Sequence, residues 1–400
     1  MSDKDAGKID VGTPAFRRVN IAVFSCGFSI FAILYCQQPV LPLLTQEFGI
    51  TPAESSLAVS LPCITLAVAM LFASSLSDAI GRKPLMLAAL ALSSLLTLAL
   101  YWVNSWTMML WLRGLAGVAL SGAPAVTLAY LVDEIQPKAV TKAVGLYVGG
   151  SALGGMAGRL VAAGVTDVGS WRLAMLLIAL TGFVSLAVFW RAMPASRHFT
   201  ASKGGPIDLL RSMIGLFRVR TIVLLVIVGF FGLGSFMTLF NYLGFRLQGE
   251  PFNLSQATAG LIFLAYPIGS VGSAFFGARA ARFGRGPVLI FCASSLFVAL
   301  GLMIPDSLVS LIVGLAVLTF CFFGLHAICS SWAPAATPQS KAQASSLYLL
   351  NYYVGGGVAG SVGGIFWGWN GWLGVVAFCG TLMLGILVMA VALNRNARTQ

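Results

Sequence analysis

Long apolar segments alternate with short polar ones along almost the whole chain. The hydrocarbon core of a bilayer is about 30 Å thick, and a helix needs about 20 residues to cross it. Twelve segments that approach or exceed this length cover residues 19–41, 55–75, 85–103, 107–131, 142–165, 171–191, 221–245, 257–277, 287–304, 308–331, 343–366 and 371–393. The pattern predicts an all-α polytopic membrane protein with twelve transmembrane helices. The first segment lacks a cleavage site, so we expect it to remain as a span.

An internal repeat divides the predicted spans into two sets of six. At an offset of 201 residues, Gly154 aligns with Gly355 and Trp171 with Trp372, which indicates two related halves. Within the long connection between them, residues 207–217 predict either a short amphipathic surface helix or a partly ordered linker. The expected parts are a cytoplasmic tail (1–18), a six-helix bundle (19–191), a cytoplasmic linker (192–220), a second six-helix bundle (221–393) and a cytoplasmic tail (394–400).

Composition and charge exclude several classes of protein. Hydrophobic residues make up 58% of the 400 residues and charged residues 9%, whereas a soluble domain carries about 25% charged residues and a disordered chain has few apolar ones. The net charge of +12 does not indicate nucleic acid, because 20 of the 24 Lys and Arg lie in segments that share one side of the membrane. Basic residues gather on the cytoplasmic side. We therefore expect both termini to be cytoplasmic and no nucleic-acid partner.

Side chains for enzymatic or metal chemistry are scarce in the predicted spans. The seven cysteines lie in apolar segments without a CxxC pair, so neither a disulfide framework nor a metal site is expected. All 12 carboxylates lie in connections or at span ends, and His326 is the one histidine inside a span. Because an integral-membrane enzyme needs clusters of such groups, we expect neither an enzyme nor a bound cofactor.

The connection between the second and third spans carries a distinctive motif, Leu-Ser-Asp78-Ala-Ile-Gly81-Arg82-Lys83. It resembles the loop signature G-x-L-x-D-x-x-G-R-K of the major facilitator superfamily, with Ser74 in place of the first glycine. A tight turn needs Gly81, the two cations hold the turn at the membrane surface, and an anion such as Asp78 is stabilised at a helix N-terminus.

Two further motifs narrow the resemblance. Residues 113–117 (RGLAG) resemble the R-x-x-x-G motif of drug/proton antiporters, and residues 150–155 (GSALGG) are similar to their G-P-x-x-G-G motif, with Ser151 in place of proline. Over essentially the whole chain, the sequence is most similar to the bacterial YnfM-type inner-membrane transporters within the superfamily. The resemblance implies the major facilitator fold of two pseudo-symmetric bundles and secondary active transport by alternating access in a bacterial inner membrane. We expect a monomer with a small-molecule substrate and the lipid bilayer as its partners.

The resemblance also implies a cytoplasmic latch between the halves. In this family the motif acid meets the start of span eleven, here near residues 342–345, and an acid at the end of span four pairs with the motif arginine. The alternative is a surface turn whose charges only set the topology. The expected latch residues are Asp78, Gly81, Arg82, Lys83, Asp133 and Glu134.

Polar side chains inside the spans predict where a substrate binds. Charges are costly there, so Arg113 and Arg159 are functional candidates. The alternatives are an Arg113 bonded to backbone carbonyls or to Gln37 and Gln38, and an Arg159 that snorkels toward the surface. Tyrosines, amides and one or two cations suit a small amphipathic compound. The expected cavity and coupling residues are Tyr35, Gln37, Gln38, Arg113, Tyr147, Ser151, Arg159, Asn241, Tyr242, Tyr266, His326, Asn351 and Tyr352.

Proton coupling is the feature in which the sequence departs from its relatives. Many drug/proton antiporters place an acid in span one, whereas residues 35–38 here are Tyr-Cys-Gln-Gln. His326, with an unperturbed pKa of about 6.5, is the titratable candidate inside a span, and helix packing is its alternative role. We predict efflux of a drug, sugar or metabolite, driven by a proton gradient. The alternative is a facilitator or importer of a small polar metabolite on the same fold.

Overall fold

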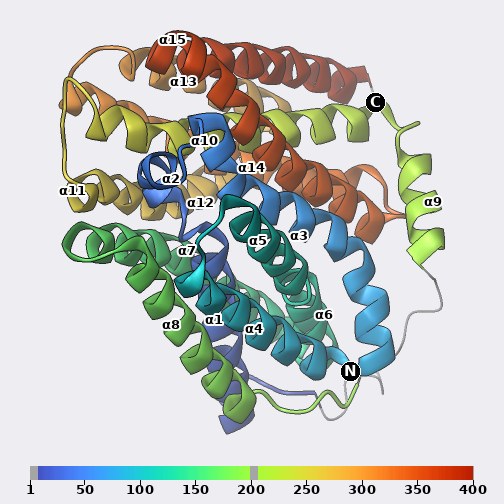
Figure 1. Cartoon of the computed structure of the whole chain (residues 1–400). Coiled ribbons are helices and arrows are strands. Elements are labelled where there is room, and N and C mark those ends of the chain that lie inside the picture. Colours follow the sequence, from blue (N-terminus) through green and yellow to red (C-terminus); the bar gives the residue numbers. More distant parts are fainter. Residues whose placement is uncertain (1–7, 199–205, 400) are drawn as a thin grey trace. The chain divides into compact units, whose positions relative to one another are not determined.

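A computed structural model describes residues 8–198 and 206–399 of the chain (Figure 1). Apart from an isolated backbone bridge between Ile9 and Ile135, the secondary structure of these residues is helical, which confirms the expected all-α class. In chain order the helices are α1 (Pro14–Tyr35), η2 (Gln38–Val40), α2 (Leu41–Phe48), α3 (Pro52–Ile80), α4 (Arg82–Ala99), η3 (Leu100–Trp102), α5 (Trp106–Leu120), α6 (Pro124–Glu134), α7 (Pro137–Val168), α8 (Trp171–Ala192), α9 (Pro206–Leu216), α10 (Arg220–Gln248), α11 (Gln256–Gly260), η4 (Leu261–Ala265), α12 (Tyr266–Phe283), α13 (Arg285–Leu302), α14 (Leu308–Ala336) and α15 (Lys341–Thr399).

Eleven helical segments of the described ranges are long and apolar enough to cross a bilayer. The last of them, α15, contains the last two of the twelve predicted spans. Non-helical backbone at Asn370 and Gly371 separates these two spans. Gly371 takes a positive φ of 52° there, a conformation that costs glycine little. The interruption lies where the sequence predicted the connection between spans eleven and twelve.

Serine side chains set the starts of several spans. Ser105, Ser170 and Ser307 each accept a hydrogen bond from the backbone N–H three residues later, at the starts of α5, α8 and α14. Such a cap satisfies one of the amide donors that a helix leaves without an internal partner in its first turn. The polar residues that interrupt the apolar pattern therefore also fix where these helices begin.

The chain forms two compact units. Unit 1 comprises Met1–Gln37 and Val68–Pro206, and unit 2 comprises Gln38–Ala67 and Ile207–Gln400. In unit 1, α1 packs against α7 and α8, and α4 packs against α5 and α8. In unit 2, α10 packs against α14 and α15, and α12 and α13 pack against α14. The division near residue 206 lies inside the predicted linker.

The segment 38–67 lies in unit 2, although it precedes most of unit 1 in the sequence. Within unit 2, the Ser56 hydroxyl lies 3.2 Å from that of Ser361 in α15, and the Gln256 amide donates to the Pro39 carbonyl at 2.7 Å. The first part of α3 therefore belongs with the helices of unit 2, and the rest of α3 with unit 1.

The helix α9 covers most of the stretch 207–217, for which the sequence predicted a helix or a linker. Met213 and Leu216 are buried in it, whereas Ile214 is 60% exposed. An amphipathic helix is therefore present in this connection, and its position at the membrane surface stays a prediction.

Glycines bring helices into close contact in both units. In unit 1, a methyl group on Gly154 of α7 would overlap the backbone carbonyl of Phe28 in α1, and one on Gly158 would come too close to Ala32. In unit 2, Gly355 of α15 lies in the same way against the carbonyl of Phe230 in α10. Small residues let membrane helices approach closely, so the glycine part of the sequence repeat serves helix packing.

Candidate functional site

The turn between α3 and α4 is built on Gly81, whose φ of 93° disfavours any other residue. The turn directs Arg82 and Lys83 into unit 1. Arg82 forms an ion pair with Asp133 at 2.5 Å, and the Lys83 ammonium donates to the Met193 carbonyl at 2.5 Å. The contact between Arg82 and Asp133 is the arginine pairing that the family resemblance implies.

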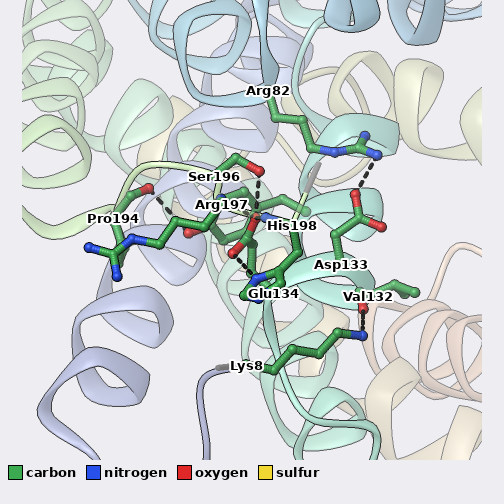
Figure 2. A network of polar contacts seen from close by, with 10 residues as sticks. Lys8, Arg82, Val132, Asp133, Glu134, Pro194, Ser196, Arg197 and His198 are labelled. Atoms are coloured by element: carbon green, nitrogen blue, oxygen red, sulfur yellow. Dashed lines mark hydrogen bonds and ion pairs between the residues drawn. The ribbon is translucent and has the colours of Figure 1, made fainter. Parts of the chain in front are cut away.

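Glu134, the neighbouring acid, binds residues 196–198 instead of Arg82 (Figure 2). Its carboxylate accepts hydrogen bonds from the Ser196 hydroxyl at 2.6 Å and from the backbone N–H groups of Arg197 and His198 at 2.6 and 2.8 Å. Its second oxygen lies 3.0 Å from the His198 ring nitrogen Nδ1. Glu134 is 2% exposed, and a buried carboxylate needs such donors. Of the two acids offered by the sequence, Asp133 binds the motif arginine and Glu134 anchors residues 196–198.

Backbone contacts fasten the N-terminal segment at the same place. The N–H of Ile9 donates to the Glu134 carbonyl at 2.8 Å, and the N–H of Gln136 donates to the Ile9 carbonyl at 3.0 Å. Asp10 pairs with Lys138 at 2.8 Å, and the hydrogen bond from Lys138 lowers the pKa of the Asp10 carboxyl. Sequence reasoning missed this cluster, since neither residue 9 nor residues 196–198 lie in a periodic or motif-bearing segment.

Arg113 of α5 is fully buried in unit 1. Its guanidinium donates to the backbone carbonyls of Ile33 at 3.0 Å and Leu34 at 2.6 Å. These carbonyls lie in the last turn of α1, where a helix leaves carbonyls without internal partners and carries partial negative charge. Arg113 thus caps the end of α1, which matches the carbonyl-bonded alternative for this residue. Gln37, just beyond α1, directs its amide toward the Met109 sulfur at 3.0 Å.

Arg159 of α7 is also fully buried and does not snorkel to the surface. Its guanidinium lies 4.2 Å from the centre of the Tyr35 ring and donates to the Gly155 carbonyl at 2.7 Å. A cation over an aromatic face is stabilised by the ring quadrupole. Ser151, one turn along α7 from Tyr147, donates to the Tyr147 carbonyl at 2.9 Å.

A second set of the expected residues lies in unit 2, on η2, α10 and α15. The Gln38 amide donates to the Asn241 side-chain oxygen at 2.7 Å, and the Tyr242 hydroxyl donates to the Gly360 carbonyl at 3.0 Å. All three side chains are at most 1% exposed. The neighbouring residues Gln37 and Gln38 therefore serve different units.

His326 of α14 lies among tyrosines of α15. Its ring nitrogen Nδ1 is 3.1 Å from the Tyr348 hydroxyl, and its ring lies 4.3 Å from that of Tyr352. Tyr266 contacts the rings of Phe236 and Phe240 edge-on, whereas the Asn351 amide donates to the Leu347 carbonyl of its own helix at 2.8 Å. Unit 2 thus gathers a histidine and tyrosines into one aromatic cluster.

Comparisons with known proteins agree on one family. The sequence model of the protein family described as Major Facilitator Superfamily matches residues 23–250. The chain is 43% identical over 385 residues to the inner membrane transport protein YnfM of Escherichia coli (strain K12), covering 96% of this chain and 92% of YnfM. It is 39% identical over 387 residues to the uncharacterized MFS-type transporter YybF of Bacillus subtilis (strain 168), covering 97% of this chain and 96% of YybF.

Solved structures of low sequence identity share the fold. A crystal structure of the peptide transporter POT in complex with sulfate is similar with a TM-score of 0.78 at 13% identity, covering 100% of this chain and 99% of that chain. At this identity the likeness concerns the arrangement of helices alone.

Proposed function

Since the chain belongs to the major facilitator superfamily and is a multi-pass inner-membrane transporter rather than an enzyme, we propose that it exports a small amphipathic compound by alternating access, driven by a proton gradient. The observation that carries the proposal is the pair of buried cations in unit 1, Arg113 and Arg159, at helix positions where charge is costly. The Arg113 segment also resembles the arginine motif of drug/proton antiporters. We further propose a monomer with both termini cytoplasmic.

The chemistry of the buried polar groups supports an amphipathic substrate, either neutral or anionic. Within unit 1, the Arg159 guanidinium lies over the Tyr35 ring, and within unit 2, the amides of Gln38 and Asn241 lie together. Ligand sites in proteins combine apolar walls with a few placed polar groups. Ligand-induced thermal stabilisation of the purified protein, screened over metabolites and drugs, identifies the substrate class. A set of hits that are all strongly cationic contradicts the proposal.

His326 is the proposed proton carrier. No carboxylate lies in the middle of a span, and the histidine ring is positioned by the Tyr348 hydroxyl and by the face of Tyr352. An imidazole that takes up and releases a proton can couple proton movement to a change of state. Accumulation of substrate in proteoliposomes, with and without a pH gradient, tests the coupling.

The absence of a mid-span carboxylate favours a second candidate, a facilitator or importer of a small polar metabolite. A facilitator equilibrates substrate in proteoliposomes whatever the pH gradient. If the wild type ignores the gradient, the facilitator replaces the exporter. If an inward proton gradient accumulates substrate inside the vesicles, protons and substrate move in the same direction, and a proton-coupled importer replaces the exporter.

The turn motif is the proposed latch. Asp78 lies in the last turn of α3, and the Arg82–Asp133 pair fixes the turn from the side of α6. Asp78→Asn is expected to slow transport while the protein remains in the membrane, and cysteine accessibility at residues 342–345 reports whether the cytoplasmic side stays open. Unchanged accessibility together with unchanged transport reduces the motif to a topological signal.

A further inference from the structure

An elongated groove of about 830 Å³ runs along unit 1 between α1, α7 and α8. The helices α7 and α8 are joined at Gly169 and Ser170, whereas the groove is lined by residues near the other ends of both, including Lys142 and Leu146 of α7 and Val188 of α8. Both helices pack against α1, which contributes more of the lining residues than either and so forms the floor of the groove.

The floor of the groove is one face of α1. Phe16, Asn20, Phe24 and Phe28 line it at intervals of four residues, which places them one above another on the helix surface. Beside them, Ile21 is 45% exposed, and Leu146 on the wall is 37% exposed. A volume of this size falls within the range of about 300–1,000 Å³ that accommodates small-molecule ligands.

Polar and apolar groups are separated along the groove. Arg17 and Lys142 lie near the N-terminal ends of α1 and α7, and both are exposed. The side-chain oxygen of Asn20, one turn further along, is buried and has no hydrogen-bond partner among the residues that the structure describes. The nearest acid in sequence, Asp10, is paired with Lys138. The groove thus offers cations and an amide at one end and aromatic and aliphatic side chains toward the middle of the span.

We propose that this groove binds an anionic phospholipid, with the headgroup phosphate at Arg17 and Lys142 and one acyl chain along the Phe24 and Phe28 face. Basic pockets between membrane helices attract anionic headgroups. The apolar part of the groove favours contact with an acyl chain, because this contact removes apolar surface from water. With the proposed orientation, the lipid comes from the cytoplasmic leaflet. The site is separate from the buried cations Arg113 and Arg159, so it does not depend on the proposed substrate.

Native mass spectrometry of the full chain in detergent tests the proposal, with phosphatidylglycerol, phosphatidylcholine of the same acyl chains and inorganic phosphate as probes. We expect one phosphatidylglycerol to be retained in preference to phosphatidylcholine. The double variant Arg17→Gln/Lys142→Gln is expected to bind it about 30-fold more weakly, from about a fivefold loss for each cation near a membrane surface. The matched control, Arg279→Gln/Arg282→Gln, removes two exposed cations of α12 in unit 2 and is expected to change retention less than twofold.

A second variant separates chain insertion from charge attraction. Leu146→Trp narrows the groove and keeps both cations, so retention of phosphatidylglycerol is expected to fall while the thermal midpoint stays near that of the wild type. Equal retention of the two lipids, an equal loss in the α12 control, or a Leu146→Trp variant that binds as the wild type does overturns the proposal. Displacement of the lipid by inorganic phosphate alone makes the cations a free-anion site and also overturns it.

Discussion

The two halves of the molecule repeat each other in backbone and differ in charge. Gly81 opens α4 with φ 93° and ψ 155°, and Gly284 opens α13 with φ 90° and ψ 150°. Both turns continue into arginine. Yet Arg82 binds Asp133, whereas Pro334 occupies the position equivalent to Asp133 at an offset of 201 residues.

The interiors of the units differ in the same way. Unit 1 buries two guanidinium groups in its spans, Arg113 and Arg159, whereas the corresponding polar groups of unit 2 are amides, tyrosines and His326. Glycine turns and glycine-lined helix contacts recur in both halves, so they belong to the fold. The buried guanidinium groups of Arg113 and Arg159 occur in the spans of unit 1 alone among the described residues, although Gly284 is also followed by an arginine, so they are the candidates for a role in the transport cycle.

The largest effect is expected from the buried cation of unit 1. Arg113→Ala removes a buried cation and leaves the Ile33 and Leu34 carbonyls without their donor. Transport is expected to fall at least about 100-fold, which corresponds to about 3 kcal/mol in the barrier of the transport cycle. Arg113→Lys restores the charge without the planar fork and is expected to recover part of the activity. Proteoliposome uptake reports the rate, and size-exclusion chromatography confirms that the variants are folded. Full activity of the alanine variant would reduce Arg113 to a packing residue.

The next effect tests His326 in the aromatic cluster of unit 2. With one proton exchanged per substrate, a gradient of one pH unit supports about tenfold accumulation, and His326→Gln is expected to abolish it while downhill exchange continues. Tyr348→Phe keeps the ring but removes the hydroxyl beside Nδ1, so it is expected to weaken the accumulation without abolishing it. If the His326→Gln variant accumulates substrate as the wild type does, His326 has a packing role and another group carries the proton.

A smaller effect compares the two turns directly. Arg82 and Asp133 are partly shielded, with side chains 11% and 24% exposed, and such a pair is worth about 1 kcal/mol. Arg82→Gln and Asp133→Asn are each expected to slow transport about fivefold, and the double variant no further, because both remove the same contact. Arg285→Gln, at the equivalent turn, is expected to stay within about twofold of wild type. Equal losses at both turns would remove the contrast between the halves.

The length and spacing of apolar segments were sufficient to predict the spans, because a bilayer imposes one thickness on every crossing. The repeat predicted related halves, and the interruption of α15 fell where polar and glycine residues separate spans eleven and twelve. The hydrogen-bond partners of Arg113 were harder to predict from the sequence. They depend on where α1 ends, for which Pro39 was a signal, since helices usually end at or before the residue that precedes a proline.

The contacts of Glu134 lay beyond the reach of the sequence. Its partners include backbone N–H groups of residues 197 and 198, and a backbone donor leaves no mark in residue identity. The alignment of the halves could show that Glu134 lacks an acidic counterpart, but the segment that it anchors follows from tertiary packing alone. Charge patterns therefore located the acids, and only the folded chain distinguished the roles of Asp133 and Glu134.

The smallest effect on transport is expected where the halves agree. Gly81 and Gly284 have nearly the same dihedral angles, in a region that costs other residues about 1–3 kcal/mol. Gly81→Ala and Gly284→Ala are therefore expected to lower the thermal midpoint by a similar few degrees, and both are expected to keep transport within about threefold of wild type when measured well below that midpoint. Differential scanning fluorimetry and uptake at low temperature give the two quantities. A different outcome is that Gly81→Ala stops transport while Gly284→Ala, with a similar thermal midpoint, does not. The same substitution then has a functional cost in one half alone, and the geometry of the first turn, as well as its charges, is part of the latch.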